Sequence, residues 1–268
     1  MNRLEKLLKE LKSQNKKVLS VFLTVGYPNI KTTEKLIIEL EKYVDIIELG
    51  IPFSDPIADG PTIQYSSQKA LENGTNIHQV FDIIKNVRQK SNIPIAIMGY
   101  LNPIYNFGLN KFFQQLKKCP TETFGNDITG VDGLIIPDMP SEESNKTRKL
   151  AKKYKIAYIP LVALTTEKNR ALKIANSSTG FVYVTAVTGI TGVREKIDSE
   201  LIPFLKTLSA KTSKPLFVGF GISKPEHIQK LKKYCDGFII GSAVIEQIRQ
   251  KKSVINFVKS LKTVLNNF

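Results

Sequence analysis

The chain has 268 residues, 42% of them hydrophobic, which is enough for one α/β barrel or for two small domains with a substantial core. No apolar run approaches the roughly 18 residues that span a bilayer, and residues 1–17 lack the apolar core of a signal peptide, so we expect neither a membrane span nor secretion. The formal charge of +15 raises the question of nucleic-acid binding, but most of the 39 basic residues are Lys spread along the chain, which is typical of a solvated surface.

Helices and short apolar strands alternate along the first half of the chain. Helices are predicted at about residues 2–14, 32–43, 61–73, 77–90 and 109–118, and strands at residues 18–24, 45–50, 94–100 and 133–137. In the second of these helices, Leu36, Ile37 and Leu40 form the apolar stripe of an amphipathic helix.

The alternation continues through the second half. The helix after the fourth strand opens at Ser141, which fits an N-cap. Strands follow at residues 157–162, 181–185, 215–219 and 237–241, and helices at 166–176, 198–210, 225–234 and, as two helices, from Ser242 onward.

Eight buried strands with helical crossovers predict a parallel sheet covered by helices. Eight such units within about 250 residues predict a (β/α)8 TIM barrel with an extra N-terminal helix, and a single domain over residues 1–268. An open doubly wound sheet is the alternative. It is less favoured because no Gly-x-Gly-x-x-Gly motif follows the first strand.

Two carboxylates stand out around the second strand. Glu48 lies inside an apolar strand, where burial raises the pKa of a carboxyl group and suits it to acid–base chemistry near neutral pH. Asp59 follows in a loop rich in Pro, Gly and Asp. The alternatives are a Glu48–Lys ion pair, a helix N-terminal charge for Asp59 and a turn role for Asp55, and sequence alone does not separate Asp55 from Asp59.

Other candidate residues follow the strand ends, where the active sites of barrels lie. Tyr100 ends the third strand, and Tyr183 lies in the sixth, where core packing is its alternative role. Glycines after the seventh and eighth strands, with Ser242 opening a helix, predict a phosphate site, against the alternative of tight turns. Residues 189–192 have the composition of a mobile lid.

The cysteine and histidine residues do not have the spacing of a disulfide or metal-binding motif. Cys119 and Cys235 are far apart in the sequence, and we expect reduced thiols in preference to a disulfide or a metal site. His78 and His227 are isolated in helical segments, so we expect no metal site from them.

The segment ELGIPFSDPIADGPTIQ, at residues 48–64, closely resembles the signature of the tryptophan synthase alpha chain family. PSEES near residue 140, TGITG at 188–192, GFGIS at 219–223 and IGSA at 240–243 resemble further landmarks of that family in the same order. The resemblance covers essentially all of the chain. It implies a (β/α)8 barrel that cleaves indole-3-glycerol phosphate to indole and glyceraldehyde 3-phosphate by a retro-aldol reaction.

The resemblance also implies roles for individual residues. Glu48 corresponds to the catalytic acid–base of the family, and Asp59 to the carboxylate that binds the indole N–H. Asp55 lies in the loop that touches the partner chain. The positions expected to bind substrate are Phe22, Tyr100 and Tyr183 at the indole, Gly192, Gly221, Gly241 and Ser242 at the phosphate, and Thr191 in the lid.

The partner implied by the resemblance is a tryptophan synthase beta chain in an alpha2-beta2 tetramer. No cofactor is expected in this chain, because pyridoxal phosphate belongs to the beta chain, which receives the indole. We expect no nucleic acid or membrane as partner. Lys- and Asn-rich usage leaves a bacterial cytoplasm or a plastid stroma open as the location.

Two segments depart from the family pattern: residues 120–129 look longer than the usual connection, and the lid reads Ala186-Val187-Thr188. Two other functions remain open. One is a different phosphate-binding barrel, such as an isomerase or a Schiff-base aldolase, although none of the predicted strands ends in the Lys that such an aldolase needs. The other is a non-catalytic protein that binds RNA or an acidic partner through its basic surface.

Overall fold

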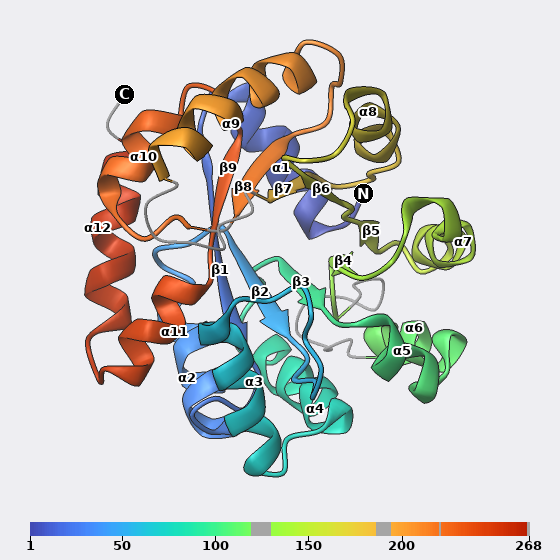
Figure 1. The fold of residues 1–268 in the computed structure, drawn as a ribbon. Coiled ribbons are helices and arrows are strands. Elements are labelled where there is room, and N and C mark those ends of the chain that lie inside the picture. Colours follow the sequence, from blue (N-terminus) through green and yellow to red (C-terminus); the bar gives the residue numbers. More distant parts are fainter. Residues whose placement is uncertain (119–129, 186–193, 220, 267–268) are drawn as a thin grey trace.

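The computed structural model describes residues 1–118, 130–185, 194–219 and 221–266 (Figure 1). Its strands form one parallel sheet in the order β5-β4-β3-β2-β1-β9-β8-β7-β6. The strands are β1 (Val18–Thr24), β2 (Ile46–Gly50), β3 (Ile95–Met98), β4 (Gly133–Ile135), β5 (Ala157–Tyr158), β6 (Leu161–Ala163), β7 (Val182–Thr185), β8 (Leu216–Gly219) and β9 (Gly237–Ile240). Every neighbouring pair in this order is parallel, as expected for buried strands joined by helical crossovers.

The sheet closes through a strand that Pro160 interrupts. β5 and β6 lie at opposite ends of the strand order but are separated by only Ile159 and Pro160 in the chain. The N–H of Ile159 donates to the carbonyl oxygen of Leu134 in β4, whereas the carbonyl oxygen of Pro160 accepts the N–H of Tyr183 in β7. The predicted strand at 157–162 is therefore two short pieces, because proline has no N–H to give to the ladder. Counted as one barrel strand, they complete the predicted (β/α)8 barrel.

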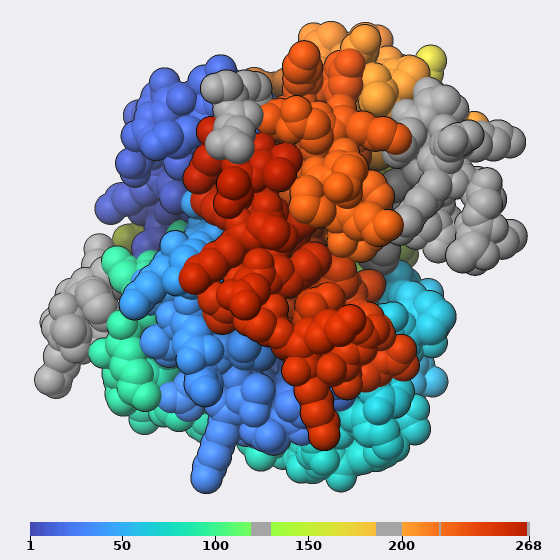
Figure 2. Space-filling view, turned by 90° about the vertical axis from the view of Figure 1, so that its left-hand side faces the viewer, coloured from blue at the N-terminus to red at the C-terminus, as the bar shows by residue number. Residues whose placement is uncertain are grey.

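Helices surround the sheet, as Figure 1 shows. They are α1 (Arg3–Ser13), α2 (Ile30–Leu40), α3 (Pro61–Glu72), α4 (Ile77–Arg88), α5 (Leu101–Phe107), α6 (Leu109–Lys117), α7 (Asn145–Lys153), α8 (Lys168–Asn176), α9 (Arg194–Ser209), α10 (Pro225–Leu231), α11 (Ser242–Arg249) and α12 (Val254–Asn266). α12 packs against α10 and α2, and Figure 2 shows the C-terminal helices in red across this face. None of the helices in the described ranges combines the length and apolar character that a membrane span requires.

Several helix predictions need correction, among them the helix predicted at 198–210, which is α9 and begins at Arg194. α2 begins at Ile30, because the side chain of Asn29 accepts the N–H of Thr32 and caps the helix. Ser141 is not an N-cap: residues 141–143 form a short 3-10 helix, and α7 begins only at Asn145. α5 covers residues 101–107, where no element was predicted, and its Pro103 falls in the first turn, where a helix tolerates proline. Gly108, with φ of +92°, separates it from α6.

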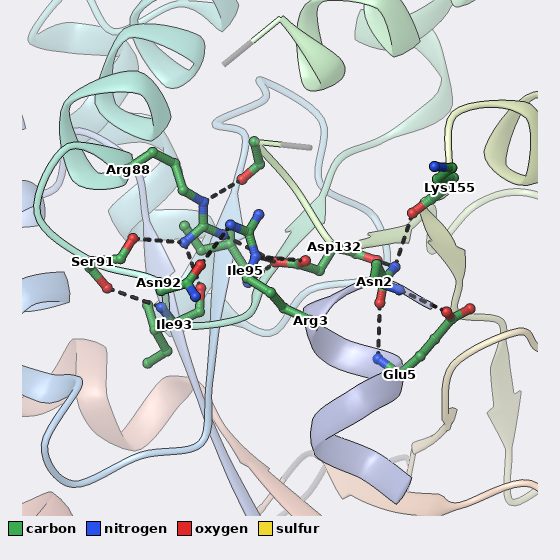
Figure 3. A network of polar contacts seen from close by, with 11 residues as sticks. Asn2, Arg3, Glu5, Arg88, Ser91, Asn92, Ile93, Ile95, Asp132 and Lys155 are labelled. Carbon is green, nitrogen blue, oxygen red and sulfur yellow. Dashed lines mark hydrogen bonds and ion pairs between the residues drawn. The ribbon is translucent and has the colours of Figure 1, made fainter. Parts of the chain in front are cut away.

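The extra N-terminal helix closes the bottom of the barrel. Leu4 of α1 is fully buried and belongs to the apolar cluster inside the barrel. Arg3 bonds through Nε to both carboxylate oxygens of Asp132, at 2.9 and 3.2 Å (Figure 3). The guanidinium of Arg88 donates to the same carboxylate at 3.1 Å, and all of these groups lie at the N-terminal end of the strands. The barrel is therefore closed at the N-terminal ends of its strands and open at their C-terminal ends.

Candidate active site

The C-terminal strand ends surround a cavity of about 810 Å³. Its floor is largely apolar, and acidic and hydroxyl groups reach it from the loops. The described residues that line it include Phe22, Ala58, Asp59, Ile63, Met98, Ile136, Pro140, Tyr158, Leu161, Tyr183, Gly221, Ser223, Ile239, Gly241 and Ser242. A cavity of this size, with a few convergent polar groups, is typical of a small-molecule site.

Glu48 lies in β2 with its carboxylate inside the barrel. In the sheet it stands beside Phe22 of β1 and Ala96 of β3. It is 0% exposed, and neither carboxylate oxygen has a hydrogen-bond partner among the described residues. Removal from water, followed by the negative charge of Asp59, raises the pKa of Glu48 to about 8. The described part of the chain thus offers no Lys partner for it, and the group is poised to hold a proton at neutral pH.

Asp59 lies on the loop between β2 and α3, half-buried at the cavity wall. The hydroxyl of Tyr100 donates to Oδ2 of Asp59 at 2.8 Å and accepts the N–H of Ala58 at 3.0 Å. Burial raises the pKa of Asp59 to about 6, although the Tyr100 hydrogen bond opposes that rise. Asp55 is exposed and does not line the cavity, so the fold separates two carboxylates that the sequence left equivalent.

Two glycines make room for the aromatic side chains at the cavity floor. A Cβ atom on Gly50 would lie 2.4 Å from the ring of Phe22, and one on Gly219 would lie 2.4 Å from the ring of Tyr183. Tyr183 is buried, and burial together with the charges of Glu48 and Asp59 raises the pKa of its hydroxyl. Tyr183 therefore stays protonated beside the two carboxyl groups.

The predicted phosphate residues converge on another part of the cavity wall. Gly221, which follows β8 with φ of +78°, lies in this wall with Gly241 and Ser242 at the start of α11. A glycine at positive φ turns the chain sharply without strain and lets the backbone approach a ligand closely. Ser223 also lines the wall, and its N–H donates to Nδ1 of His227 at 3.2 Å. Thr191 and Gly192, like the 120–129 segment, lie outside the described residues.

The fold thus brings Phe22, Glu48, Asp59, Tyr100 and Tyr183 to the end of the barrel that holds the phosphate candidates. Sequence reasoning missed the apolar lining, including Met98, Ile136, Leu161 and Ile239. The available signal was their position at the C-terminal ends of predicted strands.

Sequence reasoning also missed the role of Gly50, which resembles a simple strand terminator in the sequence. Nor did it find the ion pair that joins Arg170 and Glu142 at the rim, with two N–O distances of 3.1 Å. Among the described residues, no group of three or more His, Cys, Asp or Glu side chains is placed to hold a metal ion.

A family model described as "Tryptophan synthase alpha chain" matches residues 8–268. A tryptophan synthase alpha chain from Caldanaerobacter subterraneus subsp. tengcongensis is 44% identical over 273 residues, which cover 99% of this chain and 100% of the relative. One from Thermoanaerobacter sp. (strain X514) is 45% identical with the same coverage. The crystal structure of tryptophan synthase subunit alpha from Legionella pneumophila str. Paris has a TM-score of 0.86 at 32% identity, covering 100% of both chains.

Proposed function

Because the chain belongs to the tryptophan synthase alpha chain family, we infer that it cleaves indole-3-glycerol phosphate to indole and glyceraldehyde 3-phosphate. The reaction is a retro-aldol cleavage of a carbon–carbon bond in L-tryptophan biosynthesis. The observation that carries the site assignment is the carboxyl group of Glu48, which has no hydrogen-bond partner among the described residues and lies inside the barrel near Asp59, beside Phe22 of the 810 Å³ cavity wall. The single-domain organisation over residues 1–268 is part of this proposal, since all described strands share one sheet.

Glu48 is proposed as the acid–base. In its neutral form it gives its proton to the indole ring carbon that bears the glycerol chain, which produces an indolenine cation. The resulting carboxylate takes the proton of the adjacent hydroxyl group, and the carbon–carbon bond breaks as the aldehyde forms. The bond electrons return to the ring, so that neutral indole leaves. A pKa of about 8 supports this role, because it keeps Glu48 protonated at pH 7 before the reaction.

Asp59 is proposed to accept a hydrogen bond from the indole N–H and to stabilise the positive charge of the indolenine. A carboxylate fixed where positive charge develops lowers the barrier without reorganisation during the reaction. With a pKa of about 6, Asp59 is mostly ionised at pH 7. The hydroxyl of Tyr100 holds Oδ2 of Asp59 by a hydrogen bond. Phe22 and Tyr183 provide aromatic walls for the indole.

The phosphate group is proposed to bind at the backbone N–H groups of Gly221, Gly241 and Ser242. The first turn of α11 begins at Ser242, so its free N–H groups and helix dipole favour an anion there. Gly192 and Thr191 belong to the same proposal as residues of the phosphate site and the lid. No Lys lines the cavity in the described part of the chain, which disfavours the Schiff-base aldolase.

The partner is a tryptophan synthase beta chain in an alpha2-beta2 tetramer, and it receives the indole. Pyridoxal phosphate belongs to that chain. Asp55 is proposed to contact it, and this is supported by the exposure of the loop tip, where the neighbouring Ile57 is 81% exposed. A bacterial cytoplasm is proposed as the location, and the bacterial relatives named above support it; a plastid stroma is the alternative if the chain is plastid-encoded.

The test is release of indole from indole-3-glycerol phosphate, with and without a beta chain. We expect slow release by the isolated chain, acceleration by the partner, and a loss of at least about 100-fold in Glu48→Gln, consistent with removal of a general acid–base. Glu39→Gln, on the exposed side of α2, is the matched control and should retain activity. Wild-type turnover in Glu48→Gln would refute the acid–base assignment, and no release by folded wild type would refute the function.

A further inference from the structure

Besides Gln64 of α3, whose Nε2 donates to the carbonyl oxygen of Asp59 at 2.9 Å, side chains hold the loop that carries Asp59, residues 51–60, at two further points. At the first, Oγ of Ser67 on α3 accepts the N–H of Phe53 at 2.7 Å and donates to the carbonyl oxygen of Phe53 at 3.0 Å. At the second, the hydroxyl of Tyr100 holds Ala58 and the carboxylate of Asp59. One buried hydroxyl thus satisfies both backbone polar groups of a loop residue that has no strand to pair with.

The two attachments are in contact with each other. The rings of Phe53 and Tyr100 pack with their centroids 5.4 Å apart. Ser67, Tyr100 and Asp59 also share the walls of a small cavity of about 10 Å³ beside the strand ends. A continuous series of contacts therefore runs from Ser67 through Phe53 and Tyr100 to Asp59. Ser67 itself does not line the 810 Å³ cavity.

We propose that Ser67 is a positioning residue for the lyase reaction, which acts by fixing Phe53 and thereby the place of Tyr100 and Asp59. The inference rests on the function proposed above for Asp59. Ser67 lies on α3, a rigid element, and the loop by itself has only short internal hydrogen bonds such as that from the N–H of Asp59 to the carbonyl of Pro56. Groups that meet a developing charge need support of this kind, because displacements of about 1 Å cost catalytic rate.

The neighbouring residue provides a matched control. Ser66 is on the same helix and is also buried, and its hydroxyl makes two hydrogen bonds, to Oγ1 of Thr24 at 2.6 Å and to the carbonyl of Ile63 at 2.8 Å. It makes no hydrogen bond to the Asp59 loop. Ser66→Ala and Ser67→Ala therefore remove comparable buried hydrogen bonds, but only Ser67→Ala releases Phe53.

The first readout is turnover by the complete chain with its beta partner. We expect Ser67→Ala to lower kcat for indole release about five- to tenfold, the size expected when a hydrogen bond that orients a catalytic group is lost, with little change in KM. Ser67→Thr, which keeps the hydroxyl, should restore turnover, and Ser66→Ala should retain it. In the Asp59→Asn variant, adding Ser67→Ala should lower kcat little further. Full additivity of the two changes, or an equal loss in Ser66→Ala, would overturn the proposal.

The second readout needs no substrate. Carbon-13 NMR follows the titration of the Asp59 carboxyl group, whose titratable neighbours are Tyr100, Glu48 and Tyr183. Release of the loop hydrates Asp59, so its pKa should fall in Ser67→Ala and stay unchanged in Ser66→Ala. An unchanged Asp59 titration in folded Ser67→Ala would also overturn the proposal. If wild type releases no indole, the proposed function fails, while this titration still decides whether Ser67 positions Asp59.

Discussion

At neutral pH, Glu48 and Asp59 hold opposite protonation states although both are carboxyl groups at the same end of the barrel. Glu48 is completely enclosed, whereas Asp59 is half-buried and accepts a hydrogen bond from Tyr100, which stabilises its anion. The pKa values of about 8 and about 6 follow from this difference in surroundings. Pairs of groups whose environments separate their pKa values are typical of acid–base sites.

This difference predicts a bell-shaped pH profile. Turnover should fall below about pH 6, as Asp59 becomes protonated, and above about pH 8, as Glu48 loses its proton. The measurement is kcat/KM for indole release between pH 5 and pH 9.5, because this ratio reports the pKa values of the free enzyme. In Asp59→Asn the acid limb should disappear while the alkaline limb remains. An acid limb that persists in this variant would assign it to another group.

At the scale of elements, one hydrogen-bond arrangement recurs four times at the N-terminal end of the barrel. A side chain just before a strand accepts the N–H of a residue near the start of the preceding strand. The pairs are Asp45 with Leu19 at 2.7 Å, Asp132 with Ile95 at 2.9 Å, Thr179 with Tyr158 at 2.8 Å and Asp236 with Leu216 at 2.8 Å. These contacts join β1 to β2, β3 to β4, β5 to the segment before β7, and β8 to β9, and so help to set the register of these strand pairs.

Asp132 also forms an ion pair with the guanidinium of Arg88, whose side chain is 2% exposed. Asp132→Asn keeps an oxygen acceptor but removes this charge, so we expect a loss of about 3–5 kcal/mol in unfolding free energy. Asp236→Asn, at the equivalent position of β9, should lose only about 1 kcal/mol, as for one hydrogen bond.

Urea unfolding measures both variants. Their kcat should stay close to wild type where they are folded, because the network drawn in Figure 3 precedes the strands, whereas the cavity lies at their C-terminal ends. Equal losses of stability in the two variants would contradict a special cost for the buried guanidinium.

At the scale of the whole molecule, the burial of Glu48 in the candidate active site makes the stability of the barrel depend on pH. The folded state raises the pKa of Glu48 above its ordinary value of 4.5, so its contribution to stability is complete below pH 4.5 and is lost as the pH rises through about 8. An ionised Glu48 is costly because its carboxylate has no hydrogen-bond partner in the described structure.

Glu48→Gln should therefore stabilise the fold in alkali while it abolishes turnover. We expect its unfolding free energy to exceed that of wild type by about 2 kcal/mol or more at pH 9, and by much less at pH 5. Urea unfolding at the two pH values measures this, with Glu39→Gln as a control that should show no such trend. The same difference at both pH values would mean that Glu48 does not titrate between them.

The sequence by itself determined the alternation of strands and helices, because apolar runs and their Gly and Pro boundaries are local patterns. Parallel pairing and the barrel followed from the number and apolar character of the strands. It also located Glu48, since a carboxylate within an apolar strand stands out without knowledge of its neighbours. The break at Pro160 also has a local cause, because a proline inside a predicted strand cannot donate to the ladder.

Local sequence patterns did not separate Asp55 from Asp59, and apart from the family resemblance the tertiary structure decided between them, because both lie in one polar loop and differ in what surrounds them after folding. It likewise revealed the space that Gly50 and Gly219 leave for Phe22 and Tyr183. Ser67 is an ordinary helix residue in the sequence, and its role depends on a loop folded back onto α3. These properties depend on distances between residues from different elements, which local patterns do not encode.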